Sequence, residues 1–210
     1  MKKGLNERAL ILSVAIIAMI SPFLHIIGDI MKLIDNGYYS VTSLVIIYIS
    51  FTFLPLVVVG IFALHWQKLG WLGFIGTILY SLAFVYFAST AINPLVHMHT
   101  EVVNGALSFS ALAEMQGFSY VLHGVFMTLG GILFAVSLIR SGALPKLAGV
   151  LLITGVIINV VFNLIPIGPL FAMGTIIRNT SFIFMGIYLL KKGMSAKQTD
   201  SNILQKEEAA

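Results

Sequence analysis

The chain has no cysteine, and only 10% of its 210 residues are charged. The missing cysteines exclude disulfides, thiol catalysis and cysteine-ligated metals. The scarcity of charge excludes a soluble domain, in which about 25% of residues are charged, and also a nucleic-acid binder or a disordered chain. Apolar residues instead make up 59% of the sequence, and the mean hydropathy is +1.01. This composition predicts an all-α, polytopic membrane helix bundle in contact with a lipid bilayer.

Six apolar segments are long enough for a membrane-spanning helix, which needs about 20 residues. The predicted transmembrane helices cover residues 9–34, 41–65, 70–93, 117–139, 146–167 and 169–190. The first segment is too long for the apolar core of a cleaved signal peptide, so we expect it to remain as a helix. Most separators are short, and the long connector covers residues 94–116.

The distribution of basic residues predicts the orientation. With the N-terminus in the cytoplasm, ten of the twelve Lys and Arg residues fall on the inner side. Because cytoplasmic loops carry an excess of positive charge, both termini are expected inside the cell and the 94–116 connector outside. The polar stretch 194–210 is predicted to be a mobile cytoplasmic tail that follows a transmembrane domain of residues 1–193.

Two stretches in the second half carry a resemblance. Residues 138–149, LIRSGALPKLAG, and 186–193, GIYLLKKG, resemble a bacterial six-helix integral membrane family that is known only as a domain of unknown function. The resemblance covers about residues 118–193. It implies a bacterial inner-membrane protein and carries over no catalytic residues.

Polar side chains inside the apolar segments are the candidate functional residues. A charged side chain at the bilayer centre costs about 2.5–3.5 kcal/mol on insertion scales, so it needs a partner or a wet cavity. Helix 9–34 places Ser21, His25, Asp29 and Lys32 on one face, because they are spaced by three or four residues. The other strongly polar residues within segments are His123, Asn159, Asn163 and Arg178.

Most of these residues fall in the outer halves of their segments, which predicts a polar pocket that faces outward. The ligand-binding candidates are Arg178, Asp29, His25, His123, Asn159 and Asn163. Interhelical hydrogen bonding without a ligand, at about 0.6 kcal/mol per contact, is the alternative interpretation.

Arg178 carries the most specific prediction, because it lies nearest the middle of a segment. We expect it to point toward helix 9–34 and to engage Asp29 or His25, with Asn159 and Asn163 facing the same space. If Asp29 is the partner, Asp29→Asn should weaken the bundle and reversal of both charges should partly restore it. A buried arginine suits a small anionic or carboxylate-bearing solute.

The outer connector contains a weaker metal-site candidate. His97, His99 and Glu101 offer ligands that zinc or copper accept. No HExxH or G-x-S-x-G motif supports hydrolytic chemistry. His25 and His123 form an intramembrane histidine pair, but no recognisable haem slot surrounds them. The metal and the cofactor therefore stay unassigned.

Three functions remain open from the sequence. The pattern favours a membrane protein that binds a small molecule for transport or sensing. Because the inner half is apolar and offers no route onward, transport would need a partner membrane subunit. The alternatives are a membrane-embedded enzyme that uses the outer histidines, with or without a metal, and a non-catalytic accessory or immunity-type protein.

Overall fold

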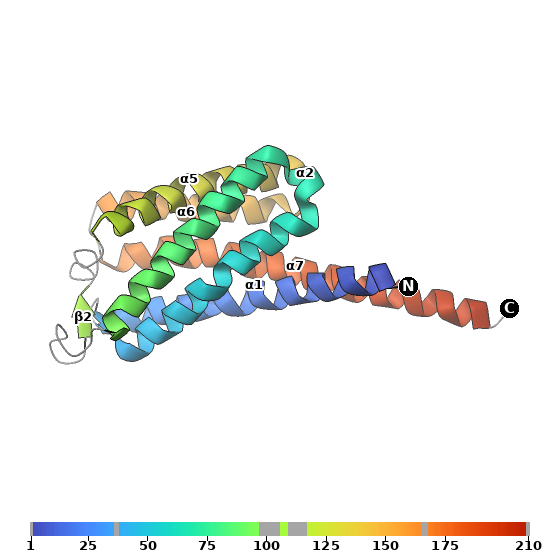
Figure 1. Ribbon diagram of the computed structural model, residues 1–210, viewed down its shortest axis with the longest axis horizontal. Helices are drawn as coiled ribbons and strands as arrows, with labels where there is room; N and C mark the ends of the chain where they lie inside the picture. The colour runs from blue at the N-terminus through green and yellow to red at the C-terminus, as the bar shows by residue number, and fades with distance from the viewer. Residues whose placement is uncertain (1, 36–37, 97–105, 109–116, 165–167, 209–210) are drawn as a thin grey trace.

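Five helices and a two-stranded ribbon make up the described part of the chain (Figure 1). The computed structural model describes residues 2–35, 38–96, 106–108, 117–164 and 168–208, and the side chains of residues 7–35, 38–92, 117–161 and 172–195. The helices are α1 (Lys2–Ile34), α2 (Val41–Val96), α5 (Phe118–Ser141), α6 (Lys146–Leu164) and α7 (Gly168–Glu208). The strands β1 (Tyr38–Ser40) and β2 (Ala106–Ser108) pair antiparallel, with Tyr39 opposite Leu107.

Helix α2 turns back on itself in the middle. The backbone leaves helical geometry at His65 (φ −134°, ψ 19°) and at Gly70 (φ 59°, ψ −161°). The two arms, residues 41–64 and 71–96, run in opposite directions and pack side by side (Figure 1). Phe51 in the first arm stacks on Phe84 and makes an edge contact with Phe87 in the second. This reversal is why a helix of 56 residues fits in the bundle.

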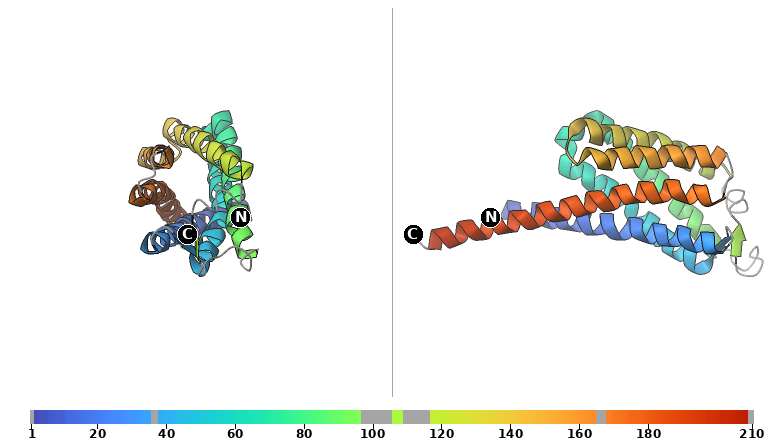
Figure 2. Two further views of the ribbon diagram at one scale, coloured as in Figure 1. Left: turned by 90° about the vertical axis from the view of Figure 1, so that its left-hand side faces the viewer. Right: turned by 180° about the vertical axis from the view of Figure 1, so that it is seen from behind.

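The helices form a ring that follows the order of the chain. Each helix packs against the next one, and α7 closes the ring by packing against α1. Viewed from the end that carries the β-ribbon, the helices surround a central space (Figure 2, left). The N-terminal end of α1 and the C-terminal end of α7 point away from the ribbon, in the direction of the end where α2 reverses (Figures 1 and 2).

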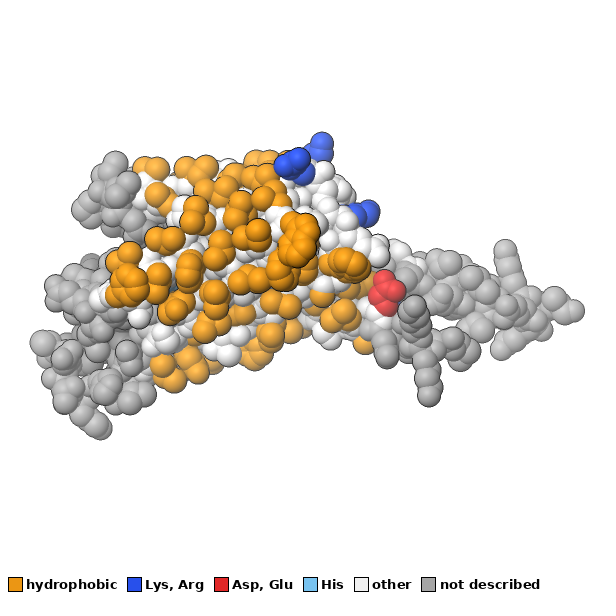
Figure 3. Space-filling view, turned by 45° about the horizontal axis from the view of Figure 1, so that its top comes forward, with side chains coloured by type: hydrophobic (Ala, Val, Ile, Leu, Met, Phe, Trp, Pro, Cys, Tyr) orange, Lys and Arg blue, Asp and Glu red, His pale blue; other side chains and the backbone are white. Residues whose placement is uncertain are grey.

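Four helices are long and apolar enough to cross a membrane, as expected of a multi-pass membrane protein. Among the described residues these spans are Glu7–Ile34, Val41–Ile92, Phe118–Ser141 and Ala172–Ser195, and Lys146–Val161 is a shorter apolar helix. On the face shown in Figure 3, apolar side chains cover the body, and lysine and arginine side chains gather toward one end. This surface is suited to contact with lipid tails.

Two glycines allow the second arm of α2 and helix α5 to pack backbone against backbone. A Cβ atom on Gly76 would collide with the backbone of Phe134, and one on Gly130 with the backbone of Tyr80. Small residues permit such approach in membranes, where helices gain little hydrophobic energy by associating. The sequence pattern of glycines is therefore a packing signal at these two positions.

The structure differs from the sequence prediction mainly at the ends of elements. The segments 41–65 and 70–93 belong to one assigned helix, α2, interrupted between them. Helix α7 continues to Glu208 through the predicted tail, because helix-forming residues such as Gln205 and Lys206 extend it; the mobility of that tail stays a prediction. Helix α6 ends at Leu164, shortly before Pro166, where proline disfavours helical geometry in the preceding residue. The β-ribbon was not predicted.

Candidate ligand-binding cavity

A cavity of about 470 Å³ lies inside the ring, and because Tyr39 of β1 lines it, it lies toward the end that carries the β-ribbon. Its volume is within the range of about 300–1,000 Å³ that is typical of ligand pockets. All five helices and β1 contribute to its wall. The lining residues are His25, Asp29, Tyr39, Phe51, Phe87, Tyr120, Val121, His123, Gly124, Met127, Thr128, Val156, Asn159, Val160, Thr175 and Arg178.

Helix α7 presents Arg178 to this cavity because α6 approaches it closely. Gly155 of α6 lies against the backbone of Arg178, where any larger side chain would collide. One turn further along, the Ser181 hydroxyl donates a hydrogen bond of 2.6 Å to the carbonyl of Ala148. These contacts fix the orientation of α7 about its own axis. Arg178 therefore faces the interior of the bundle, where it is only 4% exposed.

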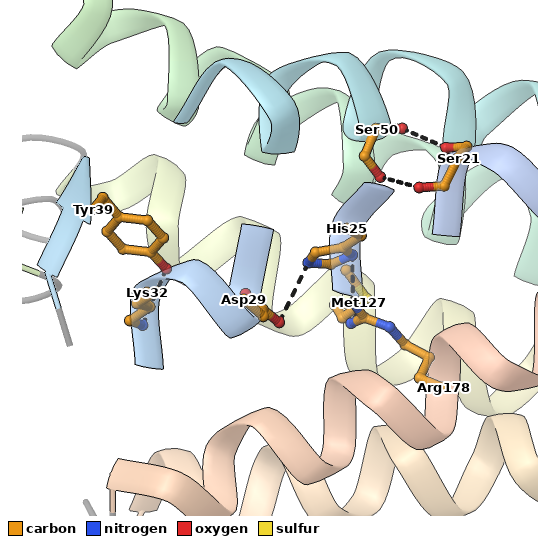
Figure 4. Close-up of polar contacts among 8 residues, drawn as sticks. All are labelled: Ser21, His25, Asp29, Lys32, Tyr39, Ser50, Met127 and Arg178. Carbon is orange, nitrogen blue, oxygen red and sulfur yellow. Dashed lines mark hydrogen bonds and ion pairs between the residues drawn. The ribbon is translucent and has the colours of Figure 1, made fainter. Parts of the chain in front are cut away.

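The guanidinium of Arg178 has two polar contacts within the bundle (Figure 4). Nη1 donates to the Met127 sulfur at 3.3 Å, and Nη2 lies 3.4 Å from Nδ1 of His25. The ring of Phe84 is 5.8 Å from the guanidinium carbon. Among the described residues, no carboxylate lies within ion-pair distance of Arg178. The direct contacts of the guanidinium are therefore with neutral groups.

His25 lies between the positive charge of Arg178 and the negative charge of Asp29. A guanidinium only donates hydrogen bonds, so Nδ1 of His25 must accept from Arg178 and the neutral ring carries its proton on Nε2. Nε2 points toward Oδ2 of Asp29, 3.8 Å away (Figure 4). The ring also makes an edge contact with Phe51, with centroids 4.4 Å apart. The three groups form an ordered row from α1 to α7.

Several buried polar atoms of the cavity residues lack a hydrogen-bond partner among the described residues. They are Oδ2 of Asp29, Oδ1 of Asn159 and Nε of Arg178. A buried donor or acceptor without a partner costs about 1–3 kcal/mol. The site therefore offers hydrogen-bonding capacity that the described protein groups do not use.

Tyr39 of β1 lines the cavity and contacts Lys32 of α1. Nζ of Lys32 donates to the Tyr39 hydroxyl at 3.1 Å and lies 4.5 Å from the centre of its ring. Burial raises the pKa of the Tyr39 phenol well above its usual value, and the nearby Asp29 carboxylate adds to that shift. Tyr39 is therefore neutral at physiological pH. The ribbon positions this side chain through its pairing with Leu107.

His123 contributes a second histidine ring from α5. Its Nδ1 donates a hydrogen bond of 2.8 Å to the carbonyl of Ala83. The ring packs on Phe87, with centroids 4.2 Å apart. This bond fixes the proton of the neutral ring on Nδ1 and leaves Nε2 as an acceptor.

No protein-family model, curated protein or solved structure matches this chain. The chemistry of the cavity therefore rests on its own residues.

The structure brings five of the six predicted ligand-binding residues to one cavity: Arg178, Asp29, His25, His123 and Asn159. The prediction that Arg178 points into the bundle and engages helix α1 is confirmed by its contact with His25. Because the contact is with His25, the charge-reversal test of Arg178 and Asp29 loses its basis. That these residues bind a ligand stays a prediction.

The remaining candidates lie outside the described residues or side chains. Asn163 belongs to α6, but its side chain is not among those described, and His97, His99 and Glu101 lie between α2 and β2. Within the described part of the chain, no three histidine or carboxylate side chains come close enough together to hold a metal ion.

The structure adds residues to the site that the sequence did not single out. Thr175 lies one turn before Arg178, and Met127 lies one turn after His123, so their helical spacing was a usable signal. Phe51 and Tyr39 gave no such signal, because an aromatic residue in an apolar segment is indistinguishable from ordinary core. Ser21, in contrast, is used in packing: Ser21 and Ser50 each donate 2.8 Å bonds to the other's carbonyl.

Proposed function

We propose that the protein binds a small anionic molecule in this cavity, for transport or sensing. The supporting observation is Arg178: its guanidinium is buried at the cavity wall, and no described carboxylate lies within ion-pair distance of it. Guanidinium groups bind carboxylates and phosphates through paired, charge-assisted hydrogen bonds. An anion in the cavity would supply the counter-charge that the described residues do not place beside Arg178.

The proposal includes a six-helix topology in the cell membrane with both termini in the cytoplasm. The reversal of α2 supports six crossings, because a straight helix of 52 apolar residues would extend about 80 Å, far beyond the roughly 30 Å of a hydrocarbon core. The end of the ring where α1 starts and α7 finishes carries exposed basic residues. They are Lys68 at the reversal of α2, and Arg140 and Lys146 near the α5–α6 connection. The cavity then faces outward.

A transport role further requires a path to the cytoplasm. On the inner side of the cavity the ring interior is filled by large apolar side chains, including Phe134, Phe182 and Met185. We therefore propose that transport would depend on a partner membrane subunit, whereas sensing would not. The resemblance to a bacterial membrane family of unknown function is compatible with either role.

The test is native mass spectrometry of the protein released from its own membranes, comparing wild type with Arg178→Gln. We expect the wild type to carry an acidic adduct that Arg178→Gln loses while it still purifies as a folded monomeric bundle. Arg140→Gln is the matched control, since it removes an exposed arginine at the end of α5 and should retain the adduct. Equal adducts in wild type and Arg178→Gln, or none in either, would contradict the proposal.

A further inference from the structure

The contact between α5 and α6 is tight at one end and open at the other. Near the connection that joins them, Gly149 of α6 lies against Ala135 and Ile139 of α5. Further out, Gly131 of α5 lies against Val156 of α6. No larger side chain would fit at either glycine without a shift. The inner halves of the two helices therefore form a closed seam.

Beyond this point the same helix faces border the cavity. The face of α5 that carries Gly131 continues toward the ribbon with three residues that line the cavity: Thr128, Gly124 and Val121. On α6, Asn159 and Val160 line it from the other side. The two helices diverge toward the end with the ribbon (Figure 2, left). The cavity therefore extends into the space between α5 and α6.

This part of the cavity reaches the outer surface of the ring. Val121 lines the cavity and is still 56% exposed. Gly124 is also exposed, and a Cβ atom built on it meets nothing within 4 Å. The flanking residues on the outer surface are apolar and exposed: Val125 of α5, and Ile157 and Val161 of α6. A rim of this composition suits contact with lipid chains, so an opening here would be reached from the bilayer.

The two ends of the cavity differ in chemistry. The deep end presents Arg178 and the hydroxyl-bearing Thr175, with His25 between Arg178 and the carboxyl group of Asp29. The guanidinium suits an anionic head group. The end between α5 and α6 presents Val121 and Val160, which suit a hydrocarbon chain. A ligand that satisfies both ends is an anion with an apolar tail.

We infer that the ligand is a single-chain amphipathic anion that enters from the bilayer between α5 and α6, with its head at Arg178 and its chain passing Gly124 and Val160. This inference rests on the proposed function and narrows its ligand class. Carboxylate and phosphate heads share the required chemistry, and the choice of probe separates them.

The experiment measures binding of dodecanoate and dodecyl phosphate to the full chain in zwitterionic lipid nanodiscs, with dodecanol as the uncharged probe and benzoate as the short acid. Gly124→Leu and Val160→Phe narrow the opening from opposite sides, so either one serves if the other fails to fold. Leu129→Trp adds bulk to the lipid-facing surface of α5 outside the rim of the opening and is the matched control.

We expect at least one of the two long-chain anions to bind about tenfold or more tightly than dodecanol, and each narrowing variant to weaken that binding by about tenfold or more. Leu129→Trp should leave it unchanged, and benzoate binding at Arg178 should be the same in wild type and Gly124→Leu. Long-chain binding that is unaffected by both narrowing variants, or dodecanol binding as tight as the anions, would overturn the inference. If benzoate binds and Arg178→Gln abolishes its binding, but no long-chain anion binds, the inference fails and the proposed function stands. If no anion binds at all, both the inference and the proposed function are contradicted.

Discussion

His25 is the residue on which the polar row of the cavity depends. It accepts from Arg178 at Nδ1 and directs its Nε2 toward Asp29, so it contacts both charged groups. A neutral imidazole can do both because its two nitrogens have opposite hydrogen-bonding roles. Removal of this ring would leave a buried cation and a buried carboxyl group without their shared neighbour.

His25→Phe therefore tests the row. Phenylalanine keeps the aromatic contact with Phe51, but we expect it to lower the free energy of unfolding by about 1–3 kcal/mol, because buried polar groups lose a partner. Unfolding in mixed detergent micelles, followed by circular dichroism, measures this change. Phe23→Leu on the lipid-facing side of α1 is the control and should have little effect.

The same variant gives a coupling test. Arg178→Gln should cost less stability in the His25→Phe background than in wild type, with an interaction energy of about 0.5–3 kcal/mol. Strict additivity of the two changes would mean that the 3.4 Å contact contributes nothing to the folded bundle.

At the scale of the elements, glycines have opposite roles on the two sides of α5. Gly130 lies against the backbone of Tyr80 in a helix contact, whereas Gly124 borders open space in the cavity wall. The sequence alone treats them alike, since both are small residues in an apolar helix. The structure separates a packing glycine from a cavity glycine.

Alanine substitutions make this difference measurable. We expect Gly130→Ala to lower the free energy of unfolding by about 1–3 kcal/mol, because the added methyl group forces two backbones apart. Gly124→Ala should be neutral or slightly stabilising, since alanine favours helical geometry over glycine. Thermal unfolding of the two variants in the same detergent compares them directly, and equal losses would be inconsistent with the described helix contact.

The turns provide a second comparison between glycines. Gly70 combines φ 59° with ψ −161°, a region that is essentially restricted to glycine. Gly142, at the C-terminus of α5, has φ 59° and ψ 18°, a left-handed conformation that asparagine also adopts. The two positions therefore differ in backbone conformation rather than in space.

We predict that Gly70→Asn destabilises the fold by about 1–3 kcal/mol through backbone strain, whereas Gly142→Asn changes it by less than about 1 kcal/mol. Neither position has an atom within 4 Å of a built Cβ, so crowding does not confuse the comparison. Chemical unfolding curves of both variants measure the difference. A Gly70→Asn variant as stable as wild type would contradict the described reversal.

The sequence predicted the helices better than it predicted the β-ribbon or the arrangement of the helices around the ring. Long apolar segments located the elements, but α1 begins at Lys2 rather than at residue 9, and α7 ends at Glu208 rather than at residue 190. The ribbon could not be predicted, because three residues on each side are too few to produce an alternating pattern. The position of each helix around the ring also gave no sequence signal, since lipid-facing and core-facing residues are both apolar.

For the cavity, ionisable residues were predictable and apolar ones were not. His25, Asp29 and Arg178 are conspicuous because burying them in an apolar helix is costly. Phe87 and Val160 also line the cavity, but they are apolar residues in apolar helices and do not stand out in the sequence. The contact of His25 with Arg178, 153 residues away along the chain, required the three-dimensional arrangement.

On the scale of the whole molecule, the absence of cysteine allows the proposed orientation to be tested without background labelling. Gln67→Cys places a single thiol at the reversal of α2, and Tyr38→Cys places one in β1, both at exposed positions. In intact bacterial cells, we expect a membrane-impermeant maleimide to label Tyr38→Cys. Gln67→Cys should react only after the membrane is permeabilised, because the basic end is proposed to face the cytoplasm. The reverse pattern would invert the topology.

The closure of the ring by α7 has a consequence for biosynthesis. Translation delivers α1 before α7, so His25 enters the membrane well before Arg178 exists. Until α7 arrives, the polar face of α1 has no neighbour on that side. A nascent chain that ends before α7 therefore has an open bundle with Asp29 and His25 uncovered, and this is the form that membrane quality-control proteases would meet. The same last step inserts Arg178 and completes the cavity, so the proposed ligand could bind only after the final helix is in place.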